Sequence, residues 1–309
     1  MDYFKPHESF QLQLDVAASL ESSNTYEPII HAGFISSIIS TVGSIINIIA
    51  LIILRKKSGP FAKLLFAIAL SDIVFGVGNI IEAKLVVSSD FDCRILFFGE
   101  NFGFFSSIAW TCCFAHYIFA TIKYNTVDLI EKYFNQYILI ATSLALGISV
   151  VLFFDEDYKI YPPTGTCWAE VEFKNFGWIE FVGFDIPCLC GIIYCGILYF
   201  KIIKILNSMG AGVHYEMMLY PLMLAVCFLP WVILDIFTLI ADVSPNYWFI
   251  LISLVMWNSQ GSLNTILYCS SGQVKNECKG RCTKKKIDYG EIEAQRADSH
   301  KESIYDSLL

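Results

Sequence analysis

Seven apolar segments, each about as long as a membrane-spanning helix, alternate with short polar segments along the chain. An α-helix rises about 1.5 Å per residue, so about 20 residues cross the hydrocarbon core of a bilayer. The pattern predicts an all-α fold, a bundle of seven transmembrane helices (residues 29–272) between an extracellular segment (1–28) and a cytoplasmic tail (273–309). The expected spans are residues 29–54, 62–87, 95–122, 136–154, 176–205, 217–241 and 247–269.

The distribution of basic residues predicts the orientation of these spans. If the N-terminus is extracellular, 14 lysine and arginine residues flank the spans on the inner side and five lie on the outer side. Basic residues concentrate on the cytoplasmic side of membrane proteins, which favours this orientation and a multi-pass protein of the plasma membrane. The composition agrees, with 55% hydrophobic and 16% charged residues. The sequence pI of about 5.1 argues against nucleic acid as a partner.

The third apolar segment is expected to be the central helix of the bundle. Polar groups are costly against lipid and are tolerated only where they face other helices or a water-filled cavity. This segment carries more of them than a lipid-facing helix would. They are Glu100, Asn101, Ser106, Ser107, Thr111 and His116.

Other polar residues predict a buried polar core that ties the spans together. Asp72 should face the bundle and hydrogen-bond to Asn47 or Asn264, where it could also hold a cation or a proton. Prolines in the fifth and sixth spans predict kinks that could act as hinges. For each tryptophan among the candidates, an ordinary role as a core aromatic is the favoured alternative. The candidates for the polar core and for a packing switch are Asn47, Asp72, Asn79, Trp110, Pro230, Trp231, Asn264 and Tyr268.

Carboxylates in the outer halves of three spans predict the chemistry of a ligand. Glu100, Asp185 and Asp235 would repel a phosphate and favour a cation or a hydrogen-bond donor. The alternative is that each carboxylate simply faces water. The expected ligand-binding residues are Glu100, Asn101, Asp185, Asp235 and Trp257.

The cysteines divide according to the side of the membrane on which they are expected. Cys93 and Cys167 fall on the oxidising outer side, which predicts a disulfide, the alternative being two unpaired thiols. Cys278 and Cys282 lie beside a basic run on the inner side. Palmitoylation there would add a lipid anchor beside anionic membrane lipid, although unmodified thiols fit equally well. No Cys and His spacing predicts a metal site, and no cofactor is expected.

Five sequence phrases, in order along the expected spans, resemble the cyclic AMP receptor family of slime moulds and, more distantly, the secretin and adhesion receptors. They are Ala-Leu-Ser-Asp-Ile-Val-Phe-Gly-Val-Gly-Asn (69–79), Ser-Ser-Ile-Ala-Trp-Thr-Cys-Cys-Phe-Ala-His-Tyr (106–117), Cys-Trp (167–168), Tyr-Pro-Leu-Met-Leu-Ala-Val-Cys-Phe-Leu-Pro-Trp (220–231) and Asn-Ser-Gln-Gly-Ser-Leu-Asn-Thr-Ile-Leu-Tyr (258–268). The resemblance covers about residues 30–272 and implies a G-protein-coupled receptor with a heterotrimeric G protein as partner. Asp235 stands where that family is expected to carry a basic residue, which argues against cyclic AMP as the ligand.

The function predicted is therefore a receptor that transduces binding of an extracellular ligand of unknown type to intracellular signalling. The alternative is a seven-helix transporter or channel, although no internal repeat supports it. A retinal protein would need a lysine in the seventh span, and none occurs between Pro245 and Cys269. No nucleophile and base are arranged as in a hydrolase, so an enzyme is not expected.

Overall fold

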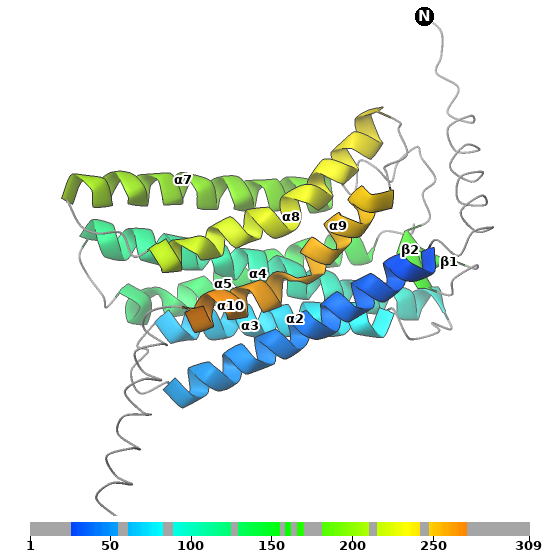
Figure 1. The fold of residues 1–309 in the computed structure, drawn as a ribbon, viewed down its shortest axis with the longest axis horizontal. Coiled ribbons are helices and arrows are strands. Elements are labelled where there is room, and N and C mark those ends of the chain that lie inside the picture. The colour runs from blue at the N-terminus through cyan, green and yellow to red at the C-terminus, as the bar shows by residue number, and fades with distance from the viewer. Residues whose placement is uncertain are drawn as a thin grey trace, which may run out of the picture. The chain divides into compact units, whose positions relative to one another are not determined.

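The computed structural model describes residues 26–54, 61–82, 89–124, 129–154, 158–161, 166–169, 181–209, 215–241 and 247–270 (Figure 1). The chain divides into two units, Met1–Leu267 and Tyr268–Leu309, and only residues 268–270 of the second are described. The long helices are α2 (Tyr26–Leu54), α3 (Phe61–Glu82), α4 (Asp90–Tyr124), α5 (Leu129–Phe153), α7 (Ile186–Met209) and α8 (Tyr215–Ala241). Two shorter helices follow, α9 (Tyr247–Asn258) and α10 (Gln260–Ser270).

The helical bundle predicted from the apolar segments is confirmed. Five helical segments of the described chain are long and apolar enough to cross a membrane, namely His31–Ile53, Ala62–Glu82, Phe91–Tyr124, Lys132–Phe153 and Phe181–Ser208, the last of which begins with a π-helical turn just before α7. Within the described residues, α8 and α9 contribute shorter apolar stretches, Leu222–Leu234 and Tyr247–Asn258. The count of seven spans stays a prediction.

Helix α4 is the central element of the first unit, as its polar residues predicted. It packs against α3, α5, α7 and α8. Its most apolar stretch is 67% buried, against 28% for the corresponding stretches of α5 and α7. Glycine permits the close contact with α3, because a Cβ on Gly103 would lie 2.5 Å from the backbone nitrogen of Phe75.

The outward faces of the helices are aliphatic. On α2, for example, Ile35, Ile39, Ile46 and Ile49 lie on one face and expose about half of their surface. Such a continuous apolar face is unfavourable in water and favourable against lipid chains. The side chains that tie α2 to its neighbours lie on the opposite, polar face.

Two short strands were not predicted. β1 (Tyr158–Tyr161) and β2 (Thr166–Ala169) form an antiparallel pair in which Cys167 lies opposite Ile160, and both strands contact α4. The all-α expectation therefore omits a hairpin next to the central helix. The sequence between the strands, Pro-Pro-Thr-Gly, consists of residues that favour turns.

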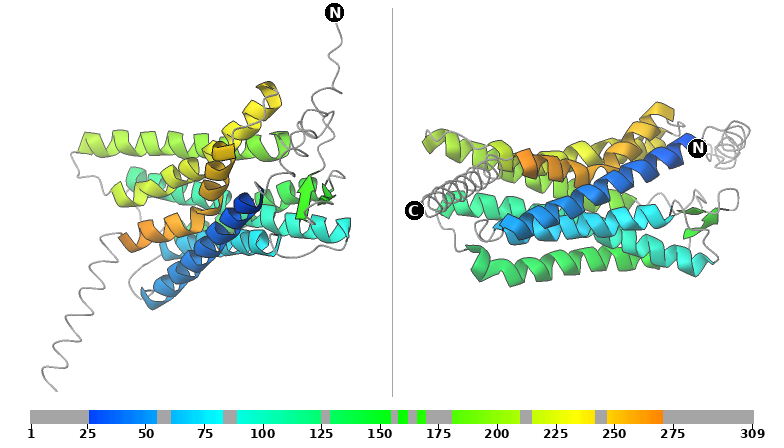
Figure 2. Two further views of the ribbon diagram at one scale, coloured as in Figure 1. Left: turned by 45° about the vertical axis from the view of Figure 1, so that its right-hand side comes forward. Right: turned by 60° about the horizontal axis from the view of Figure 1, so that its bottom comes forward.

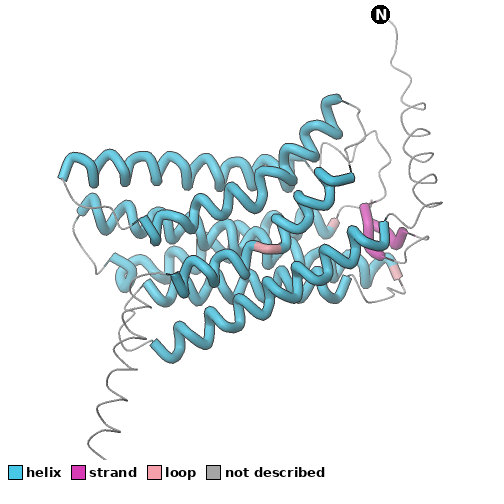
Figure 3. Tube along the Cα trace, viewed as in Figure 1, coloured by secondary structure: helices cyan, strands magenta, loops and turns pink. Residues whose placement is uncertain are grey.

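The break in the seventh span does not lie at a proline, and the kinks expected at the prolines stay a prediction. Helix α8 continues through Pro230, which does not interrupt it, because neighbouring groups in a membrane bundle can compensate for the lost hydrogen bond. Pro187 lies in the first turn of α7, after a π-helical turn η1 (Phe181–Asp185). The seventh span breaks at Ser259, between α9 and α10, without any proline (Figure 3).

Candidate functional site

A hydrogen-bonded polar network around Asp72 joins α3, α4 and α10 inside the bundle. The Ser107 hydroxyl donates to Oδ1 of Asp72 at 2.6 Å, and Nδ2 of Asn264 donates to Oδ2 at 2.9 Å. Gln260 Nε2 in turn donates to the Ser107 hydroxyl at 2.8 Å. All four side chains are buried. Each oxygen of the carboxylate thus receives a donor, which compensates for its removal from water.

The two expected neighbours of Asp72 are placed differently. Asn264 donates to its carboxylate, as expected from the sequence. Asn47 is equally buried on α2, but no hydrogen bond joins it to Asp72 among the described residues. Ser107 and Gln260 complete the network instead. Both were visible in the sequence as polar residues within apolar spans, but no spacing rule pairs them.

The break in the seventh span lies directly beside this network. The backbone N–H of Gly261, which has no partner within an interrupted helix, donates to the Ser40 hydroxyl on α2 at 2.9 Å. A Cβ on Gly261 would lie 2.8 Å from that hydroxyl and would overlap the hydroxyl of Ser44. Glycine is therefore needed where the broken helix meets α2.

The polar face of α2 was not predicted to be part of the site. Ser36, Ser37, Ser40, Thr41 and Ser44 are all buried on it. The hydroxyl groups of Ser37 and Thr41 donate hydrogen bonds to backbone carbonyl oxygens one turn earlier on the same helix, at 2.8 Å each. Small residues spaced by four positions let transmembrane helices approach closely, and this spacing was the available signal.

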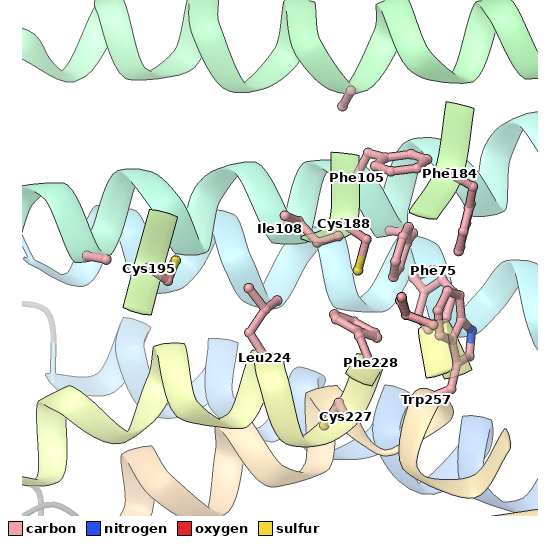
Figure 4. Packing of buried hydrophobic residues seen from close by; sticks show 14 of the residues in the cluster. Phe75, Phe105, Ile108, Phe184, Cys188, Cys195, Leu224, Cys227, Phe228 and Trp257 are labelled. Atoms are coloured by element: carbon pink, nitrogen blue, oxygen red, sulfur yellow. The ribbon is translucent and has the colours of Figure 1, made fainter. Parts of the chain in front are cut away.

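A cluster of aromatic rings adjoins the polar network. Trp257, two residues before the break, stacks on Phe104 with ring centroids 4.4 Å apart. Phe184, Phe228 and Trp231 surround it at 5.3, 5.1 and 5.4 Å. Figure 4 shows Trp257 with Phe184 and Phe75 at one end of the buried cluster. The rings come from α3, α4, η1, α8 and α9, so a movement of Trp257 would change its contacts with four neighbouring elements.

This packing bears on two predicted roles. Trp257 exposes only 7% of its surface, so in this structure it is a core residue, and its contact with a ligand stays a prediction. Trp231 contacts Trp257, consistent with the packing role suggested for it. Trp110 lies elsewhere, against Phe134 of α5 at 6.2 Å.

Glu100 pairs with a second carboxyl group that the sequence analysis did not select. Glu82, the last residue of α3, hydrogen-bonds to Glu100. Asn79 also hydrogen-bonds to Glu100 and donates to the carbonyl oxygen of Phe75 at 3.0 Å. Two ionised carboxylates are both acceptors, so this bond requires a shared proton. The pair then carries at most one negative charge.

The other expected ligand-binding residues do not join this pair in the described structure. Asn101 is buried and donates to the carbonyl oxygen of Phe97 on its own helix at 2.9 Å. Asp185 is buried in η1. The side chain of Asp235 lies outside the described residues, as do Cys278 and Cys282. Tyr268 belongs to the second unit.

The cysteine in the first turn of α4 is fully buried. Cys93 exposes 0% of its surface, and it is not among the free thiols of the described residues. The side chain of Cys167 is not described, although its strand contacts α4. The pairing of Cys93 with Cys167 therefore stays a prediction. Within the described chain, no group of His, Cys, Asp and Glu could hold a metal ion.

The fold and the buried polar network define a helical membrane protein of several spans. No protein-family model matches the chain. It is similar to a protein of Arabidopsis thaliana described as "G-protein coupled receptor 1", with 26% identity over 175 residues. This match covers 56% of the chain and 51% of that protein, so the chain spans about half the length of the curated relative. The similarity supports a likeness to G-protein-coupled receptors and does not extend to the cyclic AMP receptor family.

Proposed function

We propose that the chain is a seven-transmembrane receptor of the plasma membrane, with an extracellular N-terminus, that signals through a heterotrimeric G protein. The observation that carries the proposal is the position of the helix break at Ser259. It lies between the aromatic cluster around Trp257 and the polar network around Asp72. A transporter or channel, the alternative class, is not favoured by any specific contact.

The proposed mechanism is a shift between two packings of α9 and α10. A ligand in the outer half displaces the rings around Trp257 and changes the angle at the break. Gln260 then gives up its hydrogen bond to Ser107, and Asn264 gives up its hydrogen bond to Asp72. Both side chains take other partners, and the inner ends of the helices move. A ligand can drive this shift only if it binds one packing more tightly than the other.

The proposed ligand carries a positive charge or several hydrogen-bond donors. The hydrogen-bonded pair of Glu82 and Glu100 offers carboxyl oxygens and at most one negative charge. An anion such as cyclic AMP would be repelled by this charge. The resemblance to the cyclic AMP receptors therefore concerns the mode of signalling, and the ligand is proposed to be different.

The proposal is tested in cells that express the chain, with cationic amines, short peptides and cyclic nucleotides as candidate agonists. Dissociation of G-protein subunits, measured by resonance energy transfer, should follow the addition of a cationic amine or of a short peptide. A Glu100→Gln variant with normal surface expression should shift the dose–response curve. Failure to engage any G protein, together with ion flux in proteoliposomes, would favour a channel or transporter.

Two parts of the proposed topology have direct tests. An antibody should reach an N-terminal tag on intact cells and a C-terminal tag only after permeabilisation. Mass spectrometry of unreduced peptides should find Cys93 linked to Cys167. A link to another cysteine would contradict the proposed pairing.

A further inference from the structure

One face of the central helix is exposed although the helix is the most buried in the bundle. We define the α4 strip as Cys112, His116, Phe119 and Lys123, which follow each other at intervals of four, three and four residues. Such intervals place side chains on one face of a helix. His116 and Lys123 are exposed, and Cys112 and Phe119 are partly exposed.

The strip is exposed because two neighbouring helices leave it uncovered. Helix α4 packs against both α5 and α7 (Figure 2), whereas α5 and α7 hardly contact each other. On one side of the strip, Sγ of Cys112 lies 3.6 Å from Sγ of Cys195 on α7. On the other side, the ring of His116 meets Tyr137 of α5 edge-on at 6.0 Å. The strip therefore runs along the lipid-facing side between the two helices.

Two lysines meet at the inner end of the strip. Nζ of Lys123 lies 5.6 Å from the ring centroid of Phe119, and Nζ of Lys201 on α7 lies 5.9 Å from the same centroid. The two ammonium groups are thus at most about 12 Å apart, although they repel each other. Neither forms an ion pair within the described part of the chain. The described acidic side chains, Asp72, Glu82, Asp92, Glu100 and Asp185, belong to the bundle core or to the outer half.

We propose that the α4 strip and Lys201 bind a phospholipid with an anionic headgroup from the inner leaflet. The phosphate lies between Lys123 and Lys201, and one acyl chain follows the strip past Phe119. His116 supplies a hydrogen-bond donor deeper along the strip, which suits a glycerol or ester oxygen. The occupant is inferred from charge complementarity, because inner-leaflet lipids attract basic residues at the membrane surface.

This inference rests on the membrane-spanning character of α4 and α7. It does not require coupling to a G protein, so either proposal can fail without the other. A lipid at this position would hold α7 against α4 and thereby influence the packing that the proposed receptor changes. An acidic protein segment is the competing occupant.

The test uses the full chain in nanodiscs of phosphatidylcholine with one tenth phosphatidylserine. Native mass spectrometry counts the phosphatidylserine molecules that remain bound after gentle removal of the disc. The Lys123→Gln/Lys201→Gln variant should retain about tenfold to thirtyfold less phosphatidylserine, since each basic residue near the surface contributes about 1 kcal/mol to the binding of anionic lipid. Nanodiscs present the same lipid on both faces, so the result does not depend on orientation.

The matched control is Lys63→Gln/Lys132→Gln, which also removes two exposed lysines. Lys63 lies over Phe134, and Lys132 lies over Tyr133. This control should retain the lipid as the unchanged protein does. An equal loss in both variants would indicate general electrostatic attraction, and no loss in the strip variant would overturn the proposal. Unchanged melting temperatures exclude misfolding as the cause.

A second measurement locates the lipid. A phosphatidylserine with a photoreactive acyl chain should crosslink to peptides of α4 and α7, and His116→Phe should lower the yield severalfold. Displacement of the lipid by a soluble acidic peptide, with no crosslink to either helix, would favour a protein partner and contradict the lipid site.

Discussion

Replacing Gly261 by alanine should destabilise the contact between the broken seventh span and α2. The added Cβ would lie 2.8 Å from Oγ of Ser40 and 2.9 Å from its carbonyl oxygen, and it would overlap Oγ of Ser44. The serine hydroxyls can rotate away, but the carbonyl oxygen belongs to the backbone of α2. The helices must therefore separate by several tenths of an ångström.

The expected cost follows from three terms. Overpacking of a tight contact costs about 1–3 kcal/mol. Loss of the hydrogen bond from the Gly261 N–H to Ser40 adds about 1 kcal/mol. The higher helix propensity of alanine relative to glycine offsets about 1 kcal/mol of this cost. We expect Gly261→Ala to lower the free energy of unfolding by about 2 kcal/mol.

The assay is the unfolding of purified protein in mixed micelles, followed by circular dichroism as denaturing detergent is added. Gly147→Ala on α5 is the matched control, because a Cβ there meets nothing within 4 Å. This variant gains the higher helix propensity of alanine without any steric overlap, so it should be at least as stable as the unchanged protein.

A double variant tests the geometry itself. Ser44→Gly removes the nearest obstacle, so Ser44→Gly/Gly261→Ala should recover part of the loss. Recovery should be incomplete, because the Ser40 carbonyl oxygen remains. If Gly261→Ala unfolds at the same detergent fraction as Gly147→Ala, the close contact between α10 and α2 is wrong.

Two further predictions concern the polar groups. Ser107→Ala removes partners from both Asp72 and Gln260 and should cost about 1–3 kcal/mol in the same assay, whereas Ser106→Ala, at a position that is also buried, should cost less. Equal losses would contradict the network. Glu82→Gln can still donate a hydrogen bond to its partner carboxylate and should be nearly neutral, whereas Glu82→Ala should lose about 1 kcal/mol; equal stability of both variants would argue against the carboxyl pair.

The positions of the helices could be predicted because apolar length is nearly sufficient to define a transmembrane helix. The expected segment 29–54 corresponds to α2 (Tyr26–Leu54), and 217–241 corresponds to α8 (Tyr215–Ala241). The importance of Asp72 was also predictable, since an acid within lipid must find partners. Its contact with Ser107, and the contact of Ser107 with Gln260, could not be predicted, because no spacing rule pairs residues 35 and 153 positions apart.

The break at Ser259 could not be predicted because it depends on tertiary contacts. Ser-Gln-Gly contains no proline, and an uninterrupted helix would satisfy its backbone locally. The broken form leaves the Gly261 N–H for the Ser40 hydroxyl, and it directs Gln260 toward Ser107. Local propensity therefore favours one conformation and the neighbouring helices favour another.

The hydrogen bonds of the Asp72 network are weak enough to be broken and replaced when the helices change their packing. Hydrogen bonds between transmembrane helices contribute about 0.6 kcal/mol each on average, so the three bonds of the Asp72 network contribute about 2 kcal/mol. Coupling between a ligand site and a distant surface is typically about 1–3 kcal/mol. If the proposed ligand moves the rings around Trp257, its binding can therefore supply enough free energy to rearrange the network. The aromatic cluster, which is built from five elements, resists partial displacement, so the rearrangement is expected to occur between two discrete packings.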